Sequence, residues 1–434
     1  MRPASCNTGT SMCEIGGCAT GFDDCDADPL NGCEVDTRTD ANFCGDCGTH
    51  CSPGDRCVGS SCEGSPFVQI SAGASHTLMR RSAGGMVGWG SGAFGRLGDG
   101  AATNRATPSP SPWTFQTIDA GVEHGCGVTF GGQVVCWGQA RYRLLDTTDG
   151  VDQPGGVLID GVSDAIDVCA GTFHSCAVNG AGQVLCWGDD TFGALGTGAT
   201  NVGENGPAVV AGLDNVVAVE CGFQFSCALR ETAPGAREVW CWGRGDNGQR
   251  GDGDTATGTG IPRRALFPAG VTDLEQLEIG ANGWSVAVRT VSQEVYTWGR
   301  NDNGVLGLGS ASPVSIPANV GINGVLDVGI SFVTACAVRQ VGADRLIQCW
   351  GRNSDRQLGS TFTGSQRFEP SEPVEGVTHA TEVAVGDTHA CAITRDDSSG
   401  AQTMYCWGER FDGRTGNGEF TTADVHPPVV VQGL

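Results

Sequence analysis

Residues 176–188 read CAVNGAGQVLCWG, and this stretch decides the fold. Two short apolar segments, each carrying a cysteine, flank a turn that contains glycine, and the second segment ends in Trp187-Gly188. Alternating apolar residues on both sides of such a turn indicate a β-hairpin. Because the two cysteines lie on adjoining strands of that hairpin, we expect them to face each other.

The Trp-Gly pair recurs seven times between residues 65 and 434, at intervals of 48 to 57 residues. Each copy also contains a Pro-led apolar strand such as PAVVAGL (207–213), an alternating strand such as AIDVCAG (165–171) and a Gly-rich loop such as GALGTG (193–198). Seven copies of a four-stranded unit predict an all-β fold, a seven-bladed β-propeller. The tryptophans of the seven copies are Trp89, Trp137, Trp187, Trp242, Trp298, Trp350 and Trp407.

The two ends of the repeat region suggest how the ring closes. The first copy begins at Val68 without a Pro-led strand, and the chain finishes with a spare one, PPVVVQGL (427–434). Pairing this strand into the first blade would hide both sheet edges. We therefore expect the C-terminal strand to join the first blade.

The run WG-x-x-x-x-G-x-L-G carries a resemblance to a known family. It is clear in WGDDTFGALG (187–196) and WGRNDNGVLG (298–307), and with Gly171-x-x-His174-Ser175 it is similar to repeats of the regulator of chromosome condensation family. The resemblance covers all seven copies and implies a seven-bladed propeller. Members of that family include a nuclear exchange factor for a small GTPase and a secreted bacterial inhibitor of β-lactamases.

Five copies carry a cysteine on both hairpin strands. Copies one and five lack both, with Leu78 and Gly88, and Val286 and Thr297, in those places. Loss in pairs favours disulfides over separate buried thiols. The expected bonds join Cys126 to Cys136, Cys176 to Cys186, Cys227 to Cys241, Cys336 to Cys349, and Cys391 to Cys406. Cys169 and Cys221, on alternating strands of neighbouring copies, fit either a bridge between blades or two buried thiols.

Residues 1–64 form a separate Cys-rich module with ten cysteines and almost no apolar residues. Such a segment holds its shape only through cross-links or metal. Five disulfides explain all ten cysteines, whereas a zinc site at Cys44 and Cys47 would leave most of them unexplained. The module resembles the short Cys-rich modules of surface and secreted proteins of soil bacteria, in CEVD (33–36) followed by CGDCGTHC (44–51). We therefore expect two domains, residues 1–64 and 65–434.

Part of this module is rich in oxygen ligands. An EF-hand loop that began at Asp24 would need a glutamate where Val35 stands, so that motif is absent. A calcium site of another kind is one hypothesis, and a solvated acidic loop is the simpler one. The candidate ligands are Asp24, Asp26, Asp28, Asn31 and Glu34, and we expect no other cofactor.

The net charge of the chain limits the classes of partner that it can bind. Its 49 acidic and 25 basic residues give a net charge of -24, which disfavours nucleic acid and anionic membranes. No apolar run approaches a membrane span. The 22 cysteines indicate an oxidising compartment, so we expect an extracellular or cell-surface monomer. The start MRPASC lacks an apolar signal region, which suggests a fragment, a mature form or a truncated start.

We find no catalytic signature. The Gly-rich loops lack the Lys-Ser/Thr of a phosphate loop, and no GxSxG elbow is present. A shared repeat position holds four histidines, but aromatic residues replace it in other copies, which favours structural histidines over a metal ring. The residues at this position are His76, His124, His174, Phe225, Trp284, Thr334 and His389.

One candidate binding surface remains. The position five residues after each Trp is aromatic in copies one to three, and arginines lie close by. Interface hot spots use such residues, although the rings would also serve to pack between blades or cover the tryptophans. The partner-binding candidates are Phe94, Arg96, Tyr142, Phe192, Arg410 and Phe411. The sequence thus predicts a non-catalytic propeller that binds a protein or a surface glycan. The resemblance leaves an exchange factor and a secreted enzyme inhibitor as alternatives.

Overall fold

The computed structural model describes residues 66–145, 150–200, 203–421 and 425–434, together with six short strands between residues 5 and 64. The chain divides into two compact units, residues 1–66 with 81–86, and residues 67–80 with 87–434. The calcium candidates and the side chains of the ten cysteines in the first unit lie outside the described residues. Antiparallel pairs in that unit join β1 (Ser5–Asn7) to β2 (Met12–Glu14), β3 (Phe22–Asp23) to β4 (Val35–Asp36), and β5 (Asp55–Val58) to β6 (Ser61–Gly64).

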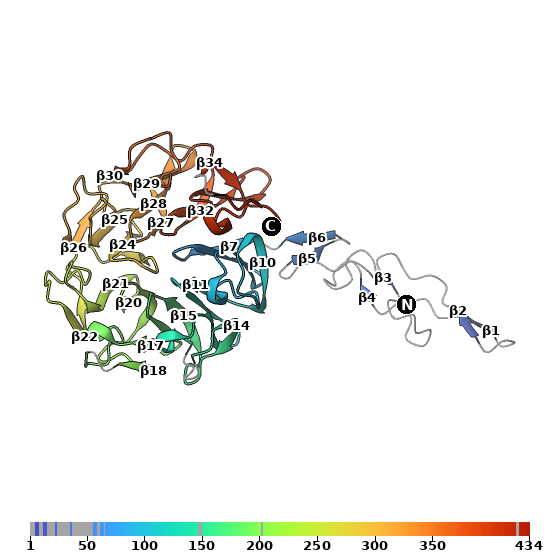
Figure 1. The fold of residues 1–434 in the computed structure, drawn as a ribbon, viewed down its shortest axis with the longest axis horizontal. Helices are drawn as coiled ribbons and strands as arrows, with labels where there is room; N and C mark the ends of the chain where they lie inside the picture. Colours follow the sequence, from blue (N-terminus) through green and yellow to red (C-terminus); the bar gives the residue numbers. More distant parts are fainter. Residues whose placement is uncertain are drawn as a thin grey trace. The chain divides into compact units, whose positions relative to one another are not determined.

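The second unit is a seven-bladed β-propeller, which confirms the predicted fold class. Each blade is a four-stranded antiparallel sheet of consecutive strands, and the blades follow one another around a central axis (Figure 1). From the axis outward, the strands are β7 (Phe67–Ala72), β8 (His76–Arg81), β9 (Gly85–Gly90) and β10 (Arg105–Thr114) in blade one; β11 (Thr117–Ala120), β12 (His124–Val128), β13 (Val134–Gly138) and β14 (Gln153–Leu158) in blade two; β15 (Ala165–Ala170), β16 (His174–Asn179), β17 (Val184–Asp189) and β18 (Glu204–Val209) in blade three; β19 (Val216–Cys221), β20 (Phe225–Ala233), β21 (Ala236–Arg244) and β22 (Gly258–Arg264) in blade four; β23 (Leu274–Glu278), β24 (Ser285–Thr290), β25 (Val295–Gly299) and β26 (Val314–Asn319) in blade five; β27 (Val325–Ile330), β28 (Thr334–Val341), β29 (Asp344–Arg352) and β30 (Gln366–Arg367) in blade six; β31 (Ala380–Val385), β32 (His389–Arg395), β33 (Gln402–Gly408) and β34 (Val425–Val430) in blade seven. Short 3-10 turns follow the third strand in four blades: η1 (Ala93–Gly95), η2 (Arg141–Arg143), η3 (Thr191–Gly193) and η4 (Phe411–Gly413).

The prediction that the C-terminal strand joins the first blade is wrong. Strand β34 pairs with β33 and completes blade seven. The Pro-led strand turns back on the Trp-Gly strand of its own copy, so each copy ends with this strand instead of beginning with it. Blade one accordingly takes its outer strand, β10, from residues 105–114. The ring closes through side chains: the Ile70 N–H donates to Glu382 Oε1 at 2.7 Å, and the Phe67 N–H donates to Gln402 Oε1 at 2.7 Å.

The repeated tryptophans hold the blades together. All seven side chains are completely buried. Each indole N–H donates to a loop carbonyl of the preceding blade, seven residues after that blade's own Trp, at 2.7–3.0 Å. The Trp-Gly repeat therefore marks a contact between blades as well as the end of a strand.

The structure joins all five predicted cysteine pairs as disulfides, and the two cysteines of each pair are opposite residues of one hairpin, with Cα atoms 4.0–4.1 Å apart. It also bonds Cys169 to Cys221, across blades three and four. In blade five the register corrects the sequence alignment. Ser285, and not Trp284, takes the histidine position, and Ala287 faces Thr297. The loop before β24 is two residues longer than its counterpart in blade three, because Glu278 pairs with Ala287 where Cys169 pairs with Cys176, and Trp284 lies in this loop instead of on the strand.

Candidate recognition face

One end of the propeller is built from two sets of loops. The first residue of the second strand faces the end of the third strand, as His174 faces Gly188 in blade three. The loop that enters the second strand and the loop that leaves the third strand therefore lie at the same end of each blade. Phe173 comes from the first kind of loop and Phe192 from the second. Both sets of loops supply aromatic side chains to this end.

Four aromatic rings form a continuous row here across blades two to five. The ring centroids of Tyr142 and Phe173 are 4.9 Å apart, and those of Phe173 and Phe223 are 5.5 Å apart. The row ends where Phe223 stacks on Trp284 at 4.6 Å. All four side chains are partly exposed. Aromatic pairs at these distances stabilise one another while leaving ring surface open to a partner.

Two arginines cover one end of this row. The Arg244 guanidinium lies 4.3 Å from the Trp284 centroid and 4.8 Å from that of Phe192. Arg300 lies 4.8 Å from the same Trp284 ring and 5.2 Å from that of Phe332. Cations over aromatic faces are held by the ring quadrupole. We call these eight residues the aromatic face: Tyr142, Phe173, Phe192, Phe223, Arg244, Trp284, Arg300 and Phe332.

Carboxylates fix the arginines in place. Arg244 makes two hydrogen bonds to Asp246, Nε to Oδ1 at 2.9 Å and Nη2 to Oδ2 at 2.8 Å, and these bonds hold the pKa of that carboxyl below its usual value. Arg300 also pairs with an aspartate, and its Nε and Nη2 both contact Oδ2 of Asp302. Both guanidinium groups are therefore pre-oriented, which lowers the entropy that a partner must overcome on binding.

The six residues proposed from the sequence divide between this surface and other roles. Tyr142 and Phe192 belong to the aromatic face. Phe94 and Phe411 are 37% and 49% exposed, at the same end of blades one and seven. Arg96 is only 6% exposed, and its guanidinium donates to Ser75 Oγ and the Val122 carbonyl. Its hydrogen bonds thus stabilise blade contacts. Arg410 donates to Glu419 Oε2 of its own blade at 2.6 Å and is not part of the aromatic face.

The backbone under three of these rings is unusual. Phe94, Tyr142 and Phe192 have φ angles of 61°, 59° and 63°, in the left-handed region. Asp412 has the same conformation, with φ 61°, at the matching position of blade seven. This conformation costs a residue with a side chain about 1 kcal/mol, and Asn and Asp tolerate it best. Bulky rings at three such positions point to a role other than stability.

A second feature is the cavity on the propeller axis, with a volume of about 120 Å³. The innermost strands of six blades each place a carboxylate along it. Several of these carboxylates accept backbone N–H groups of the next blade, as Asp119 Oδ2 does from Ala170 at 2.7 Å and Asp167 Oδ2 from Val219 at 3.0 Å. The six acids are Asp119, Asp167, Glu220, Glu278, Asp327 and Glu382.

Removal from bulk solvent favours the protonated form of these acids. Burial raises the pKa of Asp327 to about 6, of Asp167 to about 7 and of Glu382 to about 8. Burial and then neighbouring acids raise the pKa of Glu220 and Glu278 well above the usual value. Among the described residues, these acids do not include three whose oxygens lie within 4.8 Å of one another. The six axial acids thus connect neighbouring blades, and their spacing does not favour a metal site.

The longer loop of blade five closes the cavity at the aromatic end. Asn282 Nδ2 donates to Asp387 Oδ2 of blade seven at 3.1 Å, and the Ala281 carbonyl accepts from Thr172 Oγ1 of blade three at 2.9 Å. The same loop presents Trp284 to the aromatic face. Burial raises the pKa of Asp387 to about 6.

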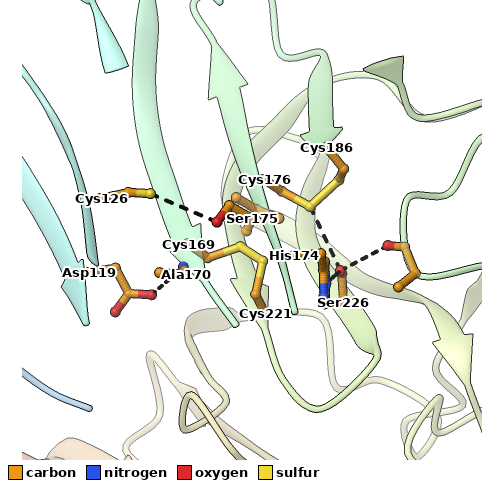
Figure 2. Close-up of a disulfide and its surroundings, with 12 residues drawn as sticks. Asp119, Cys126, Cys169, Ala170, His174, Ser175, Cys176, Cys186, Cys221 and Ser226 are labelled. Carbon is orange, nitrogen blue, oxygen red and sulfur yellow. Dashed lines mark hydrogen bonds between the residues drawn. A yellow bond between two sulfur atoms is a disulfide. The ribbon is translucent and has the colours of Figure 1, made fainter. Parts of the chain in front are cut away.

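The histidines of the repeat are structural links between blades. His124 Nε2 lies 2.7 Å from Ser175 Oγ, and His174 Nε2 lies 2.7 Å from Ser226 Oγ (Figure 2 shows His174 beside Ser226). Both bonds reach into the next blade. For His76, the residue of the next blade in the position of these serines is Gly125, which has no side-chain hydroxyl. Neither ring nitrogen of His76 has a hydrogen-bond partner.

Sequence patterns pointed to only part of the aromatic face. Phe173, Phe223 and Trp284 lie in loops whose residues vary between copies, so no repeat position identifies them. Arg244 and Arg300 had a usable signal, because an arginine directly follows Trp-Gly in three consecutive copies, at 244, 300 and 352. No helix of the described residues has the length and apolar character needed to cross a membrane.

Family models and known proteins agree with this architecture. Two models of the regulator of chromosome condensation (RCC1) repeat match residues 181–229, 293–337 and 349–393, and residues 67–96, 165–194 and 216–249. The human E3 ubiquitin-protein ligase HERC2 is 32% identical over 263 residues, 58% of this chain and 5% of that protein. The ultraviolet-B receptor UVR8 of Arabidopsis thaliana is 30% identical over 201 residues, 44% of each. The chain thus spans less than half the length of either relative.

Solved structures show the same fold. Yeast RCC1 (Prp20), bound to Kap60, has a TM-score of 0.62 at 18% identity over 74% of this chain and 78% of that one. Human WBSCR16 has a TM-score of 0.61 at 20% identity over 76% of this chain and 88% of that one. The chain thus carries repeats that match the regulator of chromosome condensation (RCC1) repeat models, and it shares the propeller fold of these structures.

Proposed function

We propose that this chain is a non-catalytic binding propeller that holds a protein partner on its aromatic face. The observation that carries the proposal is the row from Tyr142 to Trp284, covered by Arg244 and Arg300. Aromatic and arginine side chains on a rigid scaffold supply most of the binding energy in protein interfaces. Prp20p of Saccharomyces cerevisiae, with the same fold, has been characterised for binding to Gsp1p and histones.

We further propose an extracellular or cell-surface setting. Twelve cysteines of the propeller are bonded in six pairs, a use of cysteine that fits an oxidising compartment. The net charge of -24 supports a partner other than nucleic acid.

Site-specific photocross-linking tests the binding proposal. A benzophenone amino acid replaces Phe223 or Trp284, and in a control it replaces Phe130, which is 61% exposed in a hairpin at the opposite end. After incubation with secreted and surface proteins of the source cells, we expect one protein to cross-link from positions 223 and 284 and not from position 130. Adding Arg244→Ala and Arg300→Ala should abolish that product.

Two outcomes would reject the proposal: the same products from position 130, or none from the aromatic face. A glycan array supplies the alternative. Binding to a glycan that disappears with Trp284→Ala would replace the protein partner by a carbohydrate.

A further inference from the structure

Four cysteines gather between blades three and four (Figure 2). One disulfide joins Cys169 on β15 to Cys221 on β19, and a second joins Cys176 on β16 to Cys186 on β17. The sulfur atoms of Cys169, Cys176 and Cys221 all lie within 4.8 Å of one another. Among the described residues, this is the one group of three cysteine sulfurs so close together.

The strand register gives Cys176 a choice of partners. It faces Cys186 across the hairpin of β16 and β17, and it faces Cys169 across the pair of β15 and β16. Opposite residues on antiparallel strands approach closely enough for a disulfide. Cys176 therefore has two cysteines within bonding reach, one on each side.

We propose that these four cysteines form a thiol–disulfide exchange site, in which reduction of the bond between blades three and four moves the second bond within blade three. A dithiol reductant first converts the Cys169–Cys221 bond into two thiols and leaves as its own cyclic disulfide. The Cys169 thiolate then attacks the sulfur of Cys176. A Cys169–Cys176 bond forms, and Cys186 leaves as a thiolate that takes up the proton released by Cys169.

The bond between blades is the one expected to open first. Strands β15 and β19 belong to different sheets, so no ladder of backbone hydrogen bonds holds them together. Contacts such as Val219 N–H to Asp167 Oδ2 at 3.0 Å link them instead. Cys176 and Cys186 lie inside a continuous ladder. A small separation of two blades exposes Cys169–Cys221, whereas Cys176–Cys186 requires a hairpin to open.

The exchange site lies directly under the aromatic face, and this part of the inference rests on the proposed function. Cys169 is four residues before Phe173, and Cys221 is two residues before Phe223. The rings of these two phenylalanines are neighbours in the row, 5.5 Å apart. The disulfide thus fixes the spacing of the row, and its exchange for Cys169–Cys176 releases blade four from blade three.

Two matched single variants test the exchange without any reductant. In Cys186→Ser, Cys176 becomes a lone thiol beside an intact Cys169–Cys221 bond. We expect peptide mapping of the alkylated, non-reduced full chain to show Cys176 bonded to Cys169 or Cys221. In Cys349→Ser, the lone Cys336 lacks so close a third sulfur among the described residues, and every other bond should be kept. The rearranged product should be at least about tenfold more abundant in the first variant.

The wild-type chain provides a test that does not depend on how either variant folds. After brief treatment with dithiothreitol and alkylation, we expect label on Cys186 and Cys221 together with a Cys169–Cys176 linked peptide. Label on Cys169 and Cys221 with Cys176–Cys186 intact would overturn the exchange, and so would opening of the other bridges first. These maps involve no partner, so their failure is distinct from failure of the cross-linking experiment.

Discussion

The indole Nε1 of Trp89 donates a hydrogen bond to the carbonyl oxygen of Arg414 at 3.0 Å, and this bond crosses the seam between the first and last blades. Six further tryptophans make the same contact with the blade before them. The seam is therefore built like every other blade contact, without a strand shared between the two ends of the repeat region.

Removing this donor should weaken the seam. In Trp89→Phe, the buried Arg414 carbonyl loses its partner and a small cavity remains, so the free energy of unfolding should fall by about 2 kcal/mol. Urea denaturation measures the change. Trp240→Phe is the control, because the Trp240 indole is partly exposed and bonds to Glu238 of its own strand. A loss in the control equal to that in Trp89→Phe would contradict the assignment.

His76 should be replaceable by phenylalanine. Its buried ring nitrogens have no hydrogen-bond partner, and Phe225 already occupies the matching position in blade four. His76→Phe should leave stability unchanged or raise it by about 1 kcal/mol, since an unsatisfied buried polar group is removed. His174→Phe should lower stability by about 1–3 kcal/mol, because it removes the bond to Ser226. Denaturation curves that reverse this order would refute the prediction.

Stability should fall as pH rises from 6.5 to 8. Asp167 and Glu382, with a pKa of about 7 and about 8 in the folded chain, ionise near pH 4 when unfolded. The folded state holds more protons in between, so raising the pH favours unfolding by roughly 1 kcal/mol per pH unit for each group. Burial lowers the pKa of His124 to about 3 and of His174 to about 4, which reduces stability only below pH 6.5.

Variants assign this pH dependence to the axial acids. Glu382→Gln keeps an acceptor for the Ile70 N–H but does not titrate, so its melting temperature should vary less between pH 6.5 and 8 than that of the wild type. Asp344→Asn, at an exposed position, should leave the profile unchanged. An unaltered slope in Glu382→Gln would show that the dependence arises elsewhere.

Phe94 should be a residue whose removal stabilises the fold. Its left-handed backbone suits asparagine better than phenylalanine, and its side chain is 37% exposed. Phe94→Asn should raise the free energy of unfolding by about 0.5–1 kcal/mol. Ala74→Asn, in a neighbouring loop without that conformation, is the control and should give no gain. A clear loss of stability in Phe94→Asn would contradict the interpretation.

The sequence predicted the blades because each copy repeats the same strand and turn pattern. It did not determine where each blade begins and ends, because the sequence allows the Pro-led strand between two copies to pair with the copy before it or with the copy after it. The two additional residues in the loop of blade five misaligned Trp284. The axial acids do have a signal in the sequence, in TIDAG (117–121), AIDVCAG (165–171) and ATEVAVG (380–386), where one acid recurs among apolar residues. The aromatic face has no such signal as a whole, because its side chains come from five blades and meet only when the blades close into a ring.

The loop of blade five acts as a brace across the ring. Asn282 reaches Asp387 of blade seven, and Ala281 is held by Thr172 of blade three, so three blades that are not neighbours are tied at one point. A load applied to blade seven reaches blade three directly, without passing around the circumference. Trp284 lies in this loop, so a force that a partner exerts on its indole ring is transmitted to blades three, five and seven together and is not borne by a single loop.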